Sequence, residues 1–365
     1  MMHRALGAGI DRYRIWYKIT FQRGRILATP AEAWRRYADP PPFPDARRFF
    51  SCDGRIPEVR RIVEDAPRDV RIERLEFDSL HPIPLAESNR AVGRFYRPAK
   101  RADAPFVVLC HGWAHRKRRG IEHLYVRPFL RRGWAVLMLS HPLHFERTPA
   151  GVYSGELMVS GDAALTVEAF RQGVVDLEAA INFLMAEGVR PWGLFGYSLG
   201  GYIAGLLGCV RSDPAFLVMA GCGDSLLSPI LETPLGRNVR EDLEATGLGE
   251  RGRLERFWST ISPSSWRPAI PRERILLVAG RHDRIMLADS VKRLWEAWER
   301  PALCWLPRGH YTLLAAPGAL MRASLPFVQE RLSSISAQKT GAAPGGGAAP
   351  PSGLEGGPDD PGNKA

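Results

Sequence analysis

The stretch Phe195-Gly196-Tyr197-Ser198-Leu199-Gly200-Gly201 has the pattern G-x-S-x-G. An apolar run, 192–195, precedes it, and a run of small and apolar residues, 202–210, follows it. This context predicts a strand, a tight turn and a helix, with Ser198 in a strained turn that projects its hydroxyl beyond the carboxyl end of the strand. Glycine on both sides of the turn lets strand and helix approach without a Cβ clash. Ser198 is therefore the candidate nucleophile.

The composition restricts the class of protein. The 365 residues include 50 Lys and Arg against 39 Asp and Glu, which gives a net charge of +11. Such a balance invites a nucleic-acid interpretation, but only six of the basic residues are lysines and the arginines are spread along the whole chain. We therefore expect no nucleic-acid partner, whereas attraction to anionic membranes or anionic substrates stays open.

The cysteines and the apolar runs indicate the compartment. The five cysteines lack CxxC spacing and mostly lie in or beside apolar runs, which favours reduced core thiols of an intracellular protein over disulfides or a zinc site. The N-terminal region has no uninterrupted apolar run of the kind found in signal peptides, and no apolar stretch approaches the length of a membrane span. We expect a cytoplasmic protein.

Three regions are predicted along the chain. Residues 1–65 form a basic arm in which apolar and aromatic residues recur at helical spacing from Ile10 to Phe21, followed by a stiff Pro-rich connector at 40–44. This helix packs on the body of the protein, contacts anionic lipid at the inner membrane surface, or serves as a targeting segment. Residues 66–335 form the main domain. Residues 336–365 are rich in Gly, Ala and Pro without aromatics, so we expect a disordered tail.

The main domain alternates between short apolar runs and helical periodicity. Two β runs, 71–77 and 91–96, suggest an antiparallel pair. Further strands are expected at 106–110, 134–139, 192–195, 216–220, 275–279 and 302–306. Helical patterns at 121–132 and 165–187 lie between strands, so we predict an α/β fold with a mostly parallel, doubly wound sheet. A charged insertion at 223–271 with short helical fragments predicts a small helical lid.

Two polar residues follow the last two predicted strands. A serine nucleophile needs a base to take its proton and a carboxylate to orient that base. Asp283 follows the strand at 275–279, and His310 follows the strand at 302–306. Because the carboxyl ends of parallel strands meet at one crevice, we predict a triad of Ser198, His310 and Asp283. Asp224, after the strand at 216–220, is the alternative carboxylate.

The oxyanion of the reaction needs two backbone N–H donors. We expect one from Leu199, directly after the nucleophile, and one from Trp113, which follows His111 and Gly112 in the loop after the strand at 106–110. The candidate substrate-binding residues lie in or near these loops: His111, Arg116, Arg118, Arg119, His141 and Tyr197.

The basic run 115–119 directly after the oxyanion loop has two interpretations. One is the solvated start of a helix, and the other is a site for a phosphate or carboxylate group of the substrate, since basic residues at a helix N-terminus oppose its dipole. The loop 141–146, with two histidines and a glutamate, is expected to shape the pocket. We predict no metal and no other cofactor.

From about residue 70 to 335 the chain resembles the serine α/β-hydrolases. The Ser198 turn, the His111-Gly112 loop, the run from Gly280 to Asp283 and Gly309-His310 match that pattern. More distantly, the basic run, residues 126–133 and the segment 139–142 followed by Arg147 are similar to the abhydrolase-domain-containing 18 group.

The resemblance implies an α/β-hydrolase fold and cleavage of a carboxylic ester through an acyl-enzyme on Ser198. Within the abhydrolase-domain-containing 18 group it implies action on an acylated phospholipid. The same triad would serve a thioesterase, an amidase or an acyltransferase, and a catalytically silent binding protein with this fold is the alternative of a different class.

Overall fold

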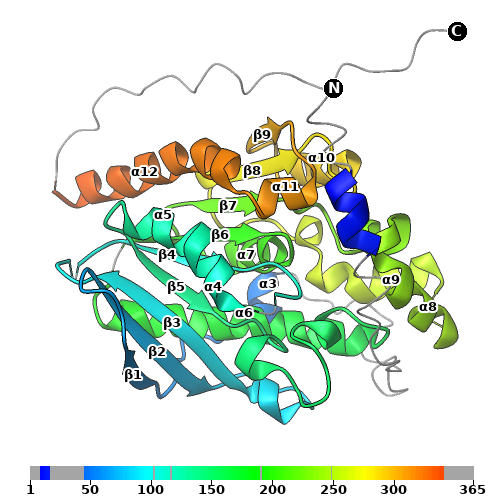
Figure 1. Ribbon diagram of the computed structural model, residues 1–365, viewed down its shortest axis with the longest axis horizontal. Helices are drawn as coiled ribbons and strands as arrows, with labels where there is room; N and C mark the ends of the chain where they lie inside the picture. Colours follow the sequence, from blue (N-terminus) through cyan, green and yellow to red (C-terminus); the bar gives the residue numbers. More distant parts are fainter. Residues whose placement is uncertain are drawn as a thin grey trace, which may run out of the picture.

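One nine-stranded sheet runs through the described part of the chain (Figure 1). The computed structural model describes residues 9–16, 45–101, 103–115, 117–189, 191–247 and 249–340, with side chains up to residue 334. In chain order the strands are β1 (Arg60–Glu64), β2 (Val70–Asp78), β3 (Arg90–Pro98), β4 (Phe106–Cys110), β5 (Ala135–Leu139), β6 (Trp192–Tyr197), β7 (Leu217–Ala220), β8 (Ile275–Gly280) and β9 (Ala302–Leu306).

The spatial order of the strands is β1-β2-β3-β5-β4-β6-β7-β8-β9. The first three strands pair antiparallel, β3 joins β5 antiparallel, and all the pairs from β5 to β9 are parallel. The predicted, mostly parallel sheet is therefore confirmed. The sequence did not indicate β1, because this edge strand carries charged residues and alternates between exposed and half-buried positions.

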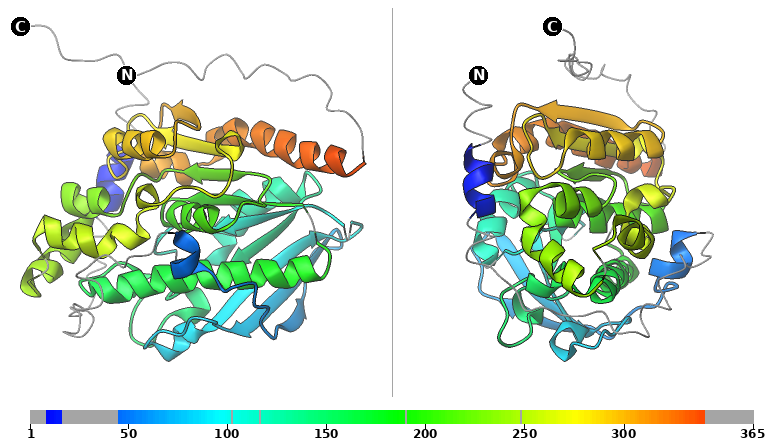
Figure 2. Two further views of the ribbon diagram at one scale, coloured as in Figure 1. Left: turned by 180° about the vertical axis from the view of Figure 1, so that it is seen from behind. Right: turned by 90° about the vertical axis from the view of Figure 1, so that its right-hand side faces the viewer.

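Helices cover both faces of the sheet (Figure 2), which confirms the doubly wound architecture. One face carries α3 (Ala46–Phe50), α6 (Ala163–Ala186), α7 (Leu199–Val210) and α10 (Ala288–Ala297), and the other carries α4 (Arg118–Ile121), α5 (Arg127–Leu130) and α12 (Gly318–Thr340). In β4, Phe106 and Val108 belong to one buried apolar cluster, while Val107 belongs to the other. This alternation follows from the two-residue period of a strand with both faces buried.

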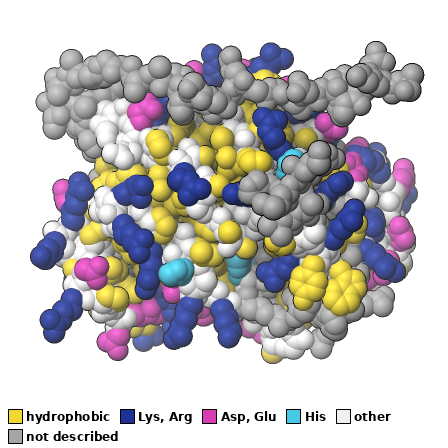
Figure 3. All heavy atoms as spheres, turned by 45° about the horizontal axis from the view of Figure 1, so that its top comes forward, with side chains coloured by type: hydrophobic (Ala, Val, Ile, Leu, Met, Phe, Trp, Pro, Cys, Tyr) yellow, Lys and Arg dark blue, Asp and Glu magenta, His cyan; other side chains and the backbone are white. Residues whose placement is uncertain are grey.

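Basic side chains are scattered over the face drawn in Figure 3. Lys and Arg lie there among apolar and neutral groups and do not form one continuous stripe. Many of the arginines pair with carboxylates, as Arg94 does with Glu64 and Arg211 with Asp213.

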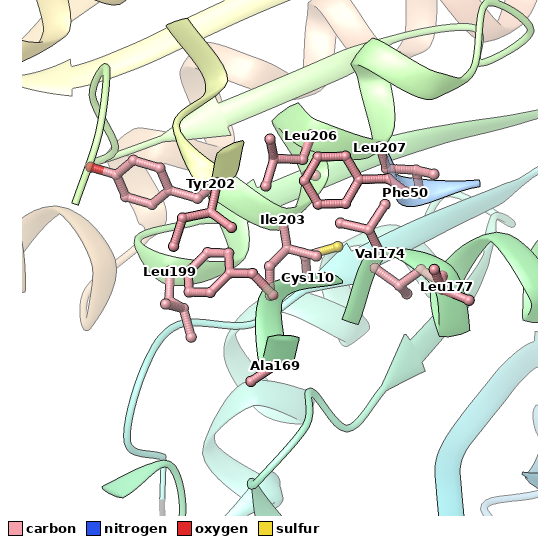
Figure 4. Close-up of a cluster of buried hydrophobic side chains, with 14 of the residues drawn as sticks. Phe50, Cys110, Ala169, Val174, Leu177, Leu199, Tyr202, Ile203, Leu206 and Leu207 are labelled. Atoms are coloured by element: carbon pink, nitrogen blue, oxygen red, sulfur yellow. The ribbon is translucent and has the colours of Figure 1, made fainter. Parts of the chain in front are cut away.

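Helix α7 begins directly after Ser198 and packs in the main apolar core. All twelve of its residues are buried, and Leu199, Ile203 and Leu206 point into a cluster that includes Phe50 of α3 and Val174 of α6 (Figure 4). A fully buried aliphatic side chain contributes about 1.5–3 kcal/mol to stability. The residue after Ser198 is therefore held by the core of the domain.

The insertion at 223–271 folds into short helices, including α8 (Arg237–Ala245) and α9 (Arg251–Trp258). Its apolar residues Leu226, Ile230 and Phe257 are buried in the main core cluster. Leu235 of this insertion lines the cleft described below. Its role as a lid stays a prediction.

The two predicted terminal regions are only partly described. Residues 1–8 and 17–44 of the arm, and 341–365 of the tail, lie outside the described residues. The segment 9–16 is helical, and α12 continues to Thr340, five residues into the range predicted as a tail.

Candidate active site

Ser198 occupies a strained turn between β6 and α7. Its φ of 52° and ψ of −125° are rare for a residue with a side chain, and such a conformation costs about 1–3 kcal/mol. Its N–H donates to the Ala220 carbonyl at 2.8 Å, which holds the turn. A Cβ on Gly196 would lie 2.3 Å from the Gly200 carbonyl oxygen, and a Cβ on Gly200 would lie 2.1 Å from the Cys110 carbonyl oxygen. The turn therefore requires both glycines.

The three side chains predicted to act together lie in one hydrogen-bonded line. Ser198 Oγ is 3.1 Å from His310 Nε2, and His310 Nδ1 is 2.8 Å from Asp283 Oδ2. The other oxygen of Asp283 accepts the N–H groups of Ile285 and Met286, both at 2.8 Å. Because a carboxylate only accepts, Nδ1 carries a proton and Nε2 is left to accept from Ser198. Chemically, this arrangement can transfer the Ser198 proton to the imidazole.

Asp224, the alternative carboxylate, lies elsewhere. It accepts hydrogen bonds from Ser290 Oγ and from Arg293 Nε at 2.6 Å. Both donors belong to α10, so Asp224 fixes that helix to the loop after β7. The hydrogen bond to the His310 ring comes from Asp283.

A cleft of about 300 Å³ lies beside the Ser198 turn. Its walls come from distant parts of the chain: Arg14, Gly112, Trp113, Ala114, His115, Gly120, Ile121, Leu124, Tyr125, Tyr197, Ser198, Leu235, Ile285, His310, Tyr311, Leu314 and Ala315. Tyr197 also lines it, with its ring stacked on Tyr125 at 4.3 Å and its hydroxyl 3.1 Å from His115 Nε2, and its binding of substrate stays a prediction. Among the described lining residues there is no Asp or Glu, so Arg14 gives the cleft a positive charge.

The loop after β4 forms one wall of this cleft. Trp113 lies in the wall, and its indole N–H donates to the Gly155 carbonyl at 2.6 Å. Ala114 has a φ of +56°, so the chain turns sharply at this point. Leu199 is the first residue of α7, and the first N–H groups of a helix have no partner inside it. Trp113 and Leu199 stay the predicted oxyanion donors.

His111 and His141 lie behind the loop, which corrects their prediction as substrate-binding residues. Both are at most 1% exposed, and neither lines the cleft. His111 Nδ1 donates to the Gly112 carbonyl at 2.9 Å and its Nε2 accepts the His141 N–H at 3.2 Å. His141 Nε2 donates to the His111 carbonyl at 3.1 Å. Both rings support the backbone of the loop.

Burial keeps these two rings neutral. It lowers the pKa of His111 and of His141 well below the ordinary value, and the charge of neighbouring histidines acts in the same direction. Nearby, His144 donates through Nδ1 to the Pro142 carbonyl at 2.8 Å and accepts the Ala114 N–H through Nε2 at 3.3 Å. We call His111, His141 and His144 the histidine cluster. Within the described residues no three His, Cys, Asp or Glu are placed to hold a metal ion.

In the basic run after the loop, His115 lines the cleft, whereas Arg118 and Arg119 do not. Arg118 pairs with Glu146, donates to Ser140 Oγ at 2.9 Å and lies over the ring of Phe145. Arg119 is exposed. This corrects, for this cleft, the prediction that these two bind substrate: neither lines it, since Glu146 holds Arg118 and the Arg119 side chain lies in solvent. Arg116 lies outside the described residues.

Two site residues from the segment 9–16 were missed. Asp11 is fully buried and accepts the N–H groups of His310 at 2.8 Å and Tyr311 at 2.9 Å. Arg14 lines the cleft, with its guanidinium 5.2 Å from the centre of the Tyr311 ring. Asp11 and His310 are 299 positions apart, and helical spacing alone gave no sign of which surface the helix contacts.

Comparison with known proteins finds similarity over part of this chain. A family model described as alpha/beta hydrolase domain containing 18 matches residues 78–224, which include the Ser198 turn and the loop after β4 but not Asp283 or His310. The uncharacterized protein YdjC of Bacillus subtilis is 29% identical over 103 residues, covering 28% of this chain and 88% of that protein. The uncharacterized protein Rv2627c of Mycobacterium tuberculosis is 28% identical over 180 residues, covering 49% of this chain and 42% of that protein.

A solved structure shares the architecture. The acetyl xylan esterase from Paenibacillus sp. R4 superposes with a TM-score of 0.56 and 14% identity, covering 80% of this chain and 98% of that chain. The alignment with the mycobacterial relative spans less than half of that protein's length. This chain has the α/β-hydrolase fold, and it is similar to the abhydrolase-domain-containing 18 family over residues 78–224.

Proposed function

We propose that this protein is a serine hydrolase that cleaves a carboxylic ester through an acyl-enzyme on Ser198. One observation carries the proposal: Ser198 lines a cleft with an apolar wall and is hydrogen-bonded to His310, which in turn is hydrogen-bonded to Asp283. The name of the Paenibacillus structure supports the ester class, since a protein with the same fold is described as an esterase.

The proposed reaction has two halves. His310 Nε2 takes the proton of Ser198 as Oγ attacks the carbonyl carbon, and the oxyanion lies against the N–H groups of Trp113 and Leu199. The intermediate collapses as the ester C–O bond breaks, and His310 gives its proton to the departing alkoxide. Water then loses a proton to His310 and attacks the acyl-enzyme, which releases the carboxylic acid and restores Ser198.

We further propose a lipid ester, with a phospholipid as the specific case. Ile121, Leu124 and Leu314 give the cleft an apolar wall suited to an acyl chain. Arg14 places a positive charge at the same cleft, suited to a phosphate group. The resemblance to the abhydrolase-domain-containing 18 group points to the same substrate class.

Peripheral contact with a membrane belongs to this proposal. Tyr13 and Trp16 on the segment 9–16 are 60% and 53% exposed, with their ring centres 6.0 Å apart. Exposed aromatic rings beside basic side chains are suited to the lipid headgroup region. No helix within the described residues combines the length and the apolar character needed to cross a bilayer.

A fluorophosphonate probe tests the serine mechanism. We expect the probe to label Ser198 in the wild type, with the labelled peptide identified by mass spectrometry, and labelling to be lost in Ser198→Ala and His310→Ala with the fold intact by circular dichroism. A folded wild type that stays unlabelled, with and without anionic vesicles, contradicts the acyl-enzyme mechanism and favours the catalytically silent binding protein.

Vesicle sedimentation tests the membrane contact. Replacing Tyr13 and Trp16 by serine is expected to weaken binding to anionic vesicles by about tenfold, because about 1–2 kcal/mol of aromatic burial at the interface is lost. The matched control replaces Ile56 and Val63, which are 53% and 65% exposed, by serine. Equal binding by the two double variants rules out the segment 9–16 as the contact.

A further inference from the structure

Asp11 connects the segment 9–16 to the predicted base. Its side chain is fully buried, and each of its oxygens accepts one N–H: Oδ2 from His310 and Oδ1 from Tyr311. Figure 1 and both views of Figure 2 draw this segment, in dark blue, beside α11 (His310–Leu314). Burial of a carboxylate destabilises the folded state unless the carboxylate is hydrogen-bonded. The two hydrogen bonds of Asp11 therefore fix the segment 9–16 beside α11.

The start of α11 needs such an acceptor. Its N-cap residue is Gly309, which has no side chain to accept the first N–H groups of the helix. Gly309 itself donates to Thr312 Oγ1 at 2.9 Å. Asp11 therefore supplies the cap from a distant part of the chain, and one of the two N–H groups that it binds belongs to His310.

We infer that Asp11 is a positioning residue for His310: it holds the His310 backbone so that the ring stays between Ser198 and Asp283. This inference rests on the proposed function. Two neighbours at helical spacing hold Asp11 in turn, since Ile15 is buried in the main core cluster and Arg14 lies over Tyr311. The segment 9–16 is thus a part of the active site.

The charge of Asp11 acts on the same ring. The charged and titratable groups that face it are Asp283, His310 and Tyr311, with Arg14 on its own segment. Burial raises the pKa of the Asp11 carboxyl and Asp283 acts in the same direction, while the two N–H donors oppose them. A carboxylate beside the imidazole stabilises the imidazolium that forms as Ser198 attacks.

The experiment compares the full-length wild type with Asp11→Ala and Asp11→Asn. The matched control is Asp103→Asn, which makes the same change at a side chain that is 88% exposed. Folding is checked by circular dichroism, and the measurements are the rate of fluorophosphonate labelling at Ser198 and the pH profile of p-nitrophenyl acetate hydrolysis.

We expect Asp11→Ala to lower kcat and the labelling rate by about 10- to 100-fold, with KM changed by less than about threefold, because a small misplacement of a catalytic group has effects of this size. Asp11→Asn keeps one acceptor and the side-chain volume, so its loss in kcat is smaller and its fold is retained. In both variants the acid limb of kcat/KM moves to lower pH, since the negative charge is gone. A purely structural role does not move that limb.

The outcomes separate the two proposals. Folded Asp11→Ala and Asp11→Asn with wild-type kcat and an unchanged pH profile overturn this inference alone. If Asp11→Ala does not fold, Asp11→Asn decides by its pH profile. A folded wild type without labelling at Ser198 overturns the proposed function and this inference with it.

Discussion

His310 and the histidine cluster lie at the same edge of the sheet and are similarly buried, yet their partners differ. The His310 ring lies between a hydroxyl and a carboxylate. The rings of His111, His141 and His144 bind backbone carbonyl and N–H groups. A carboxylate beside an imidazole stabilises its charged form, whereas a ring nitrogen that accepts a backbone N–H, as in His111 and His144, requires the neutral form. Burial alone therefore does not distinguish a histidine suited to proton transfer from one that supports a loop.

The largest expected effect is a difference in kcat between variants of Asp283 and Asp224, the two carboxylates that follow strands. Asp283→Asn is expected to lower kcat for ester hydrolysis by about 10⁴-fold, because an amide no longer holds the proton on Nδ1 of His310. Asp224→Asn makes the same change where the partners are Ser290 and Arg293, and its kcat should stay within about tenfold of the wild type. Steady-state kinetics on a neutral ester checks both. Equal losses would show that the hydrogen bond to His310 is not what the reaction depends on.

A change in the histidine cluster is expected to affect stability and activity together. His111→Ala leaves a cavity and removes the acceptor of the buried His141 N–H, so we expect the free energy of unfolding to fall by about 2–3 kcal/mol. The loop that carries Trp113 loses its support, and kcat should fall by about 10²-fold. Urea unfolding and kinetics measure both quantities.

The control for this variant is His123→Ala, since His123 is exposed. It should leave stability and kcat close to the wild type. A loss of activity in His111→Ala without any loss of stability contradicts the assignment of this ring to support and returns it to the candidate substrate-binding residues.

The cluster also depends on Gly155. This residue has a φ of +83°, and a Cβ there would lie 2.4 Å from His144 Nε2. Gly155→Ala is expected to lower the free energy of unfolding by about 1–3 kcal/mol. Gly188 has a similar φ of +81°, and a Cβ there would meet no atom within 4 Å, so Gly188→Ala isolates the cost of the backbone conformation. Equal losses in urea unfolding would mean that the contact with His144 contributes nothing.

The fold could be predicted from the sequence because its central strands are buried on both faces. Such strands are continuous apolar runs in the sequence, as in Phe106–Cys110, and the ends of each run mark the ends of the strand. The edge strand β1 has three charged residues among its five and one exposed valine, Val63. Nothing in that stretch distinguishes it from a loop.

The site was predictable where topology determines it and unpredictable where packing does. Ser198, Asp283 and His310 follow parallel strands of one sheet, so chain order predicts that they meet at one edge, and the structure brings them together. The His111 side chain could face either the cleft or the interior from its turn, and the order of residues in the sequence does not determine which. Asp11 reaches His310 through the docking of a helix whose connection to the sheet is not fixed by topology. The catalytic roles of all these residues stay predictions.

The last comparison concerns a pH dependence of stability that originates in the histidine cluster. Burial lowers the pKa of His111 and His141 in the folded protein. In the unfolded chain these rings take up protons as the pH falls through about 6.5, whereas in the folded protein they stay neutral. The unfolded state then binds more protons, so the free energy of unfolding decreases below about pH 6.5, by at most about 1.4 kcal/mol per pH unit for each ring.

Urea unfolding between pH 8 and pH 5 should show this decrease. His141→Asn should have a shallower slope of unfolding free energy against pH than the wild type, whereas His123→Asn should not. A wild-type slope that His141→Asn leaves unchanged would mean that the stability lost in acid comes from groups outside the cluster.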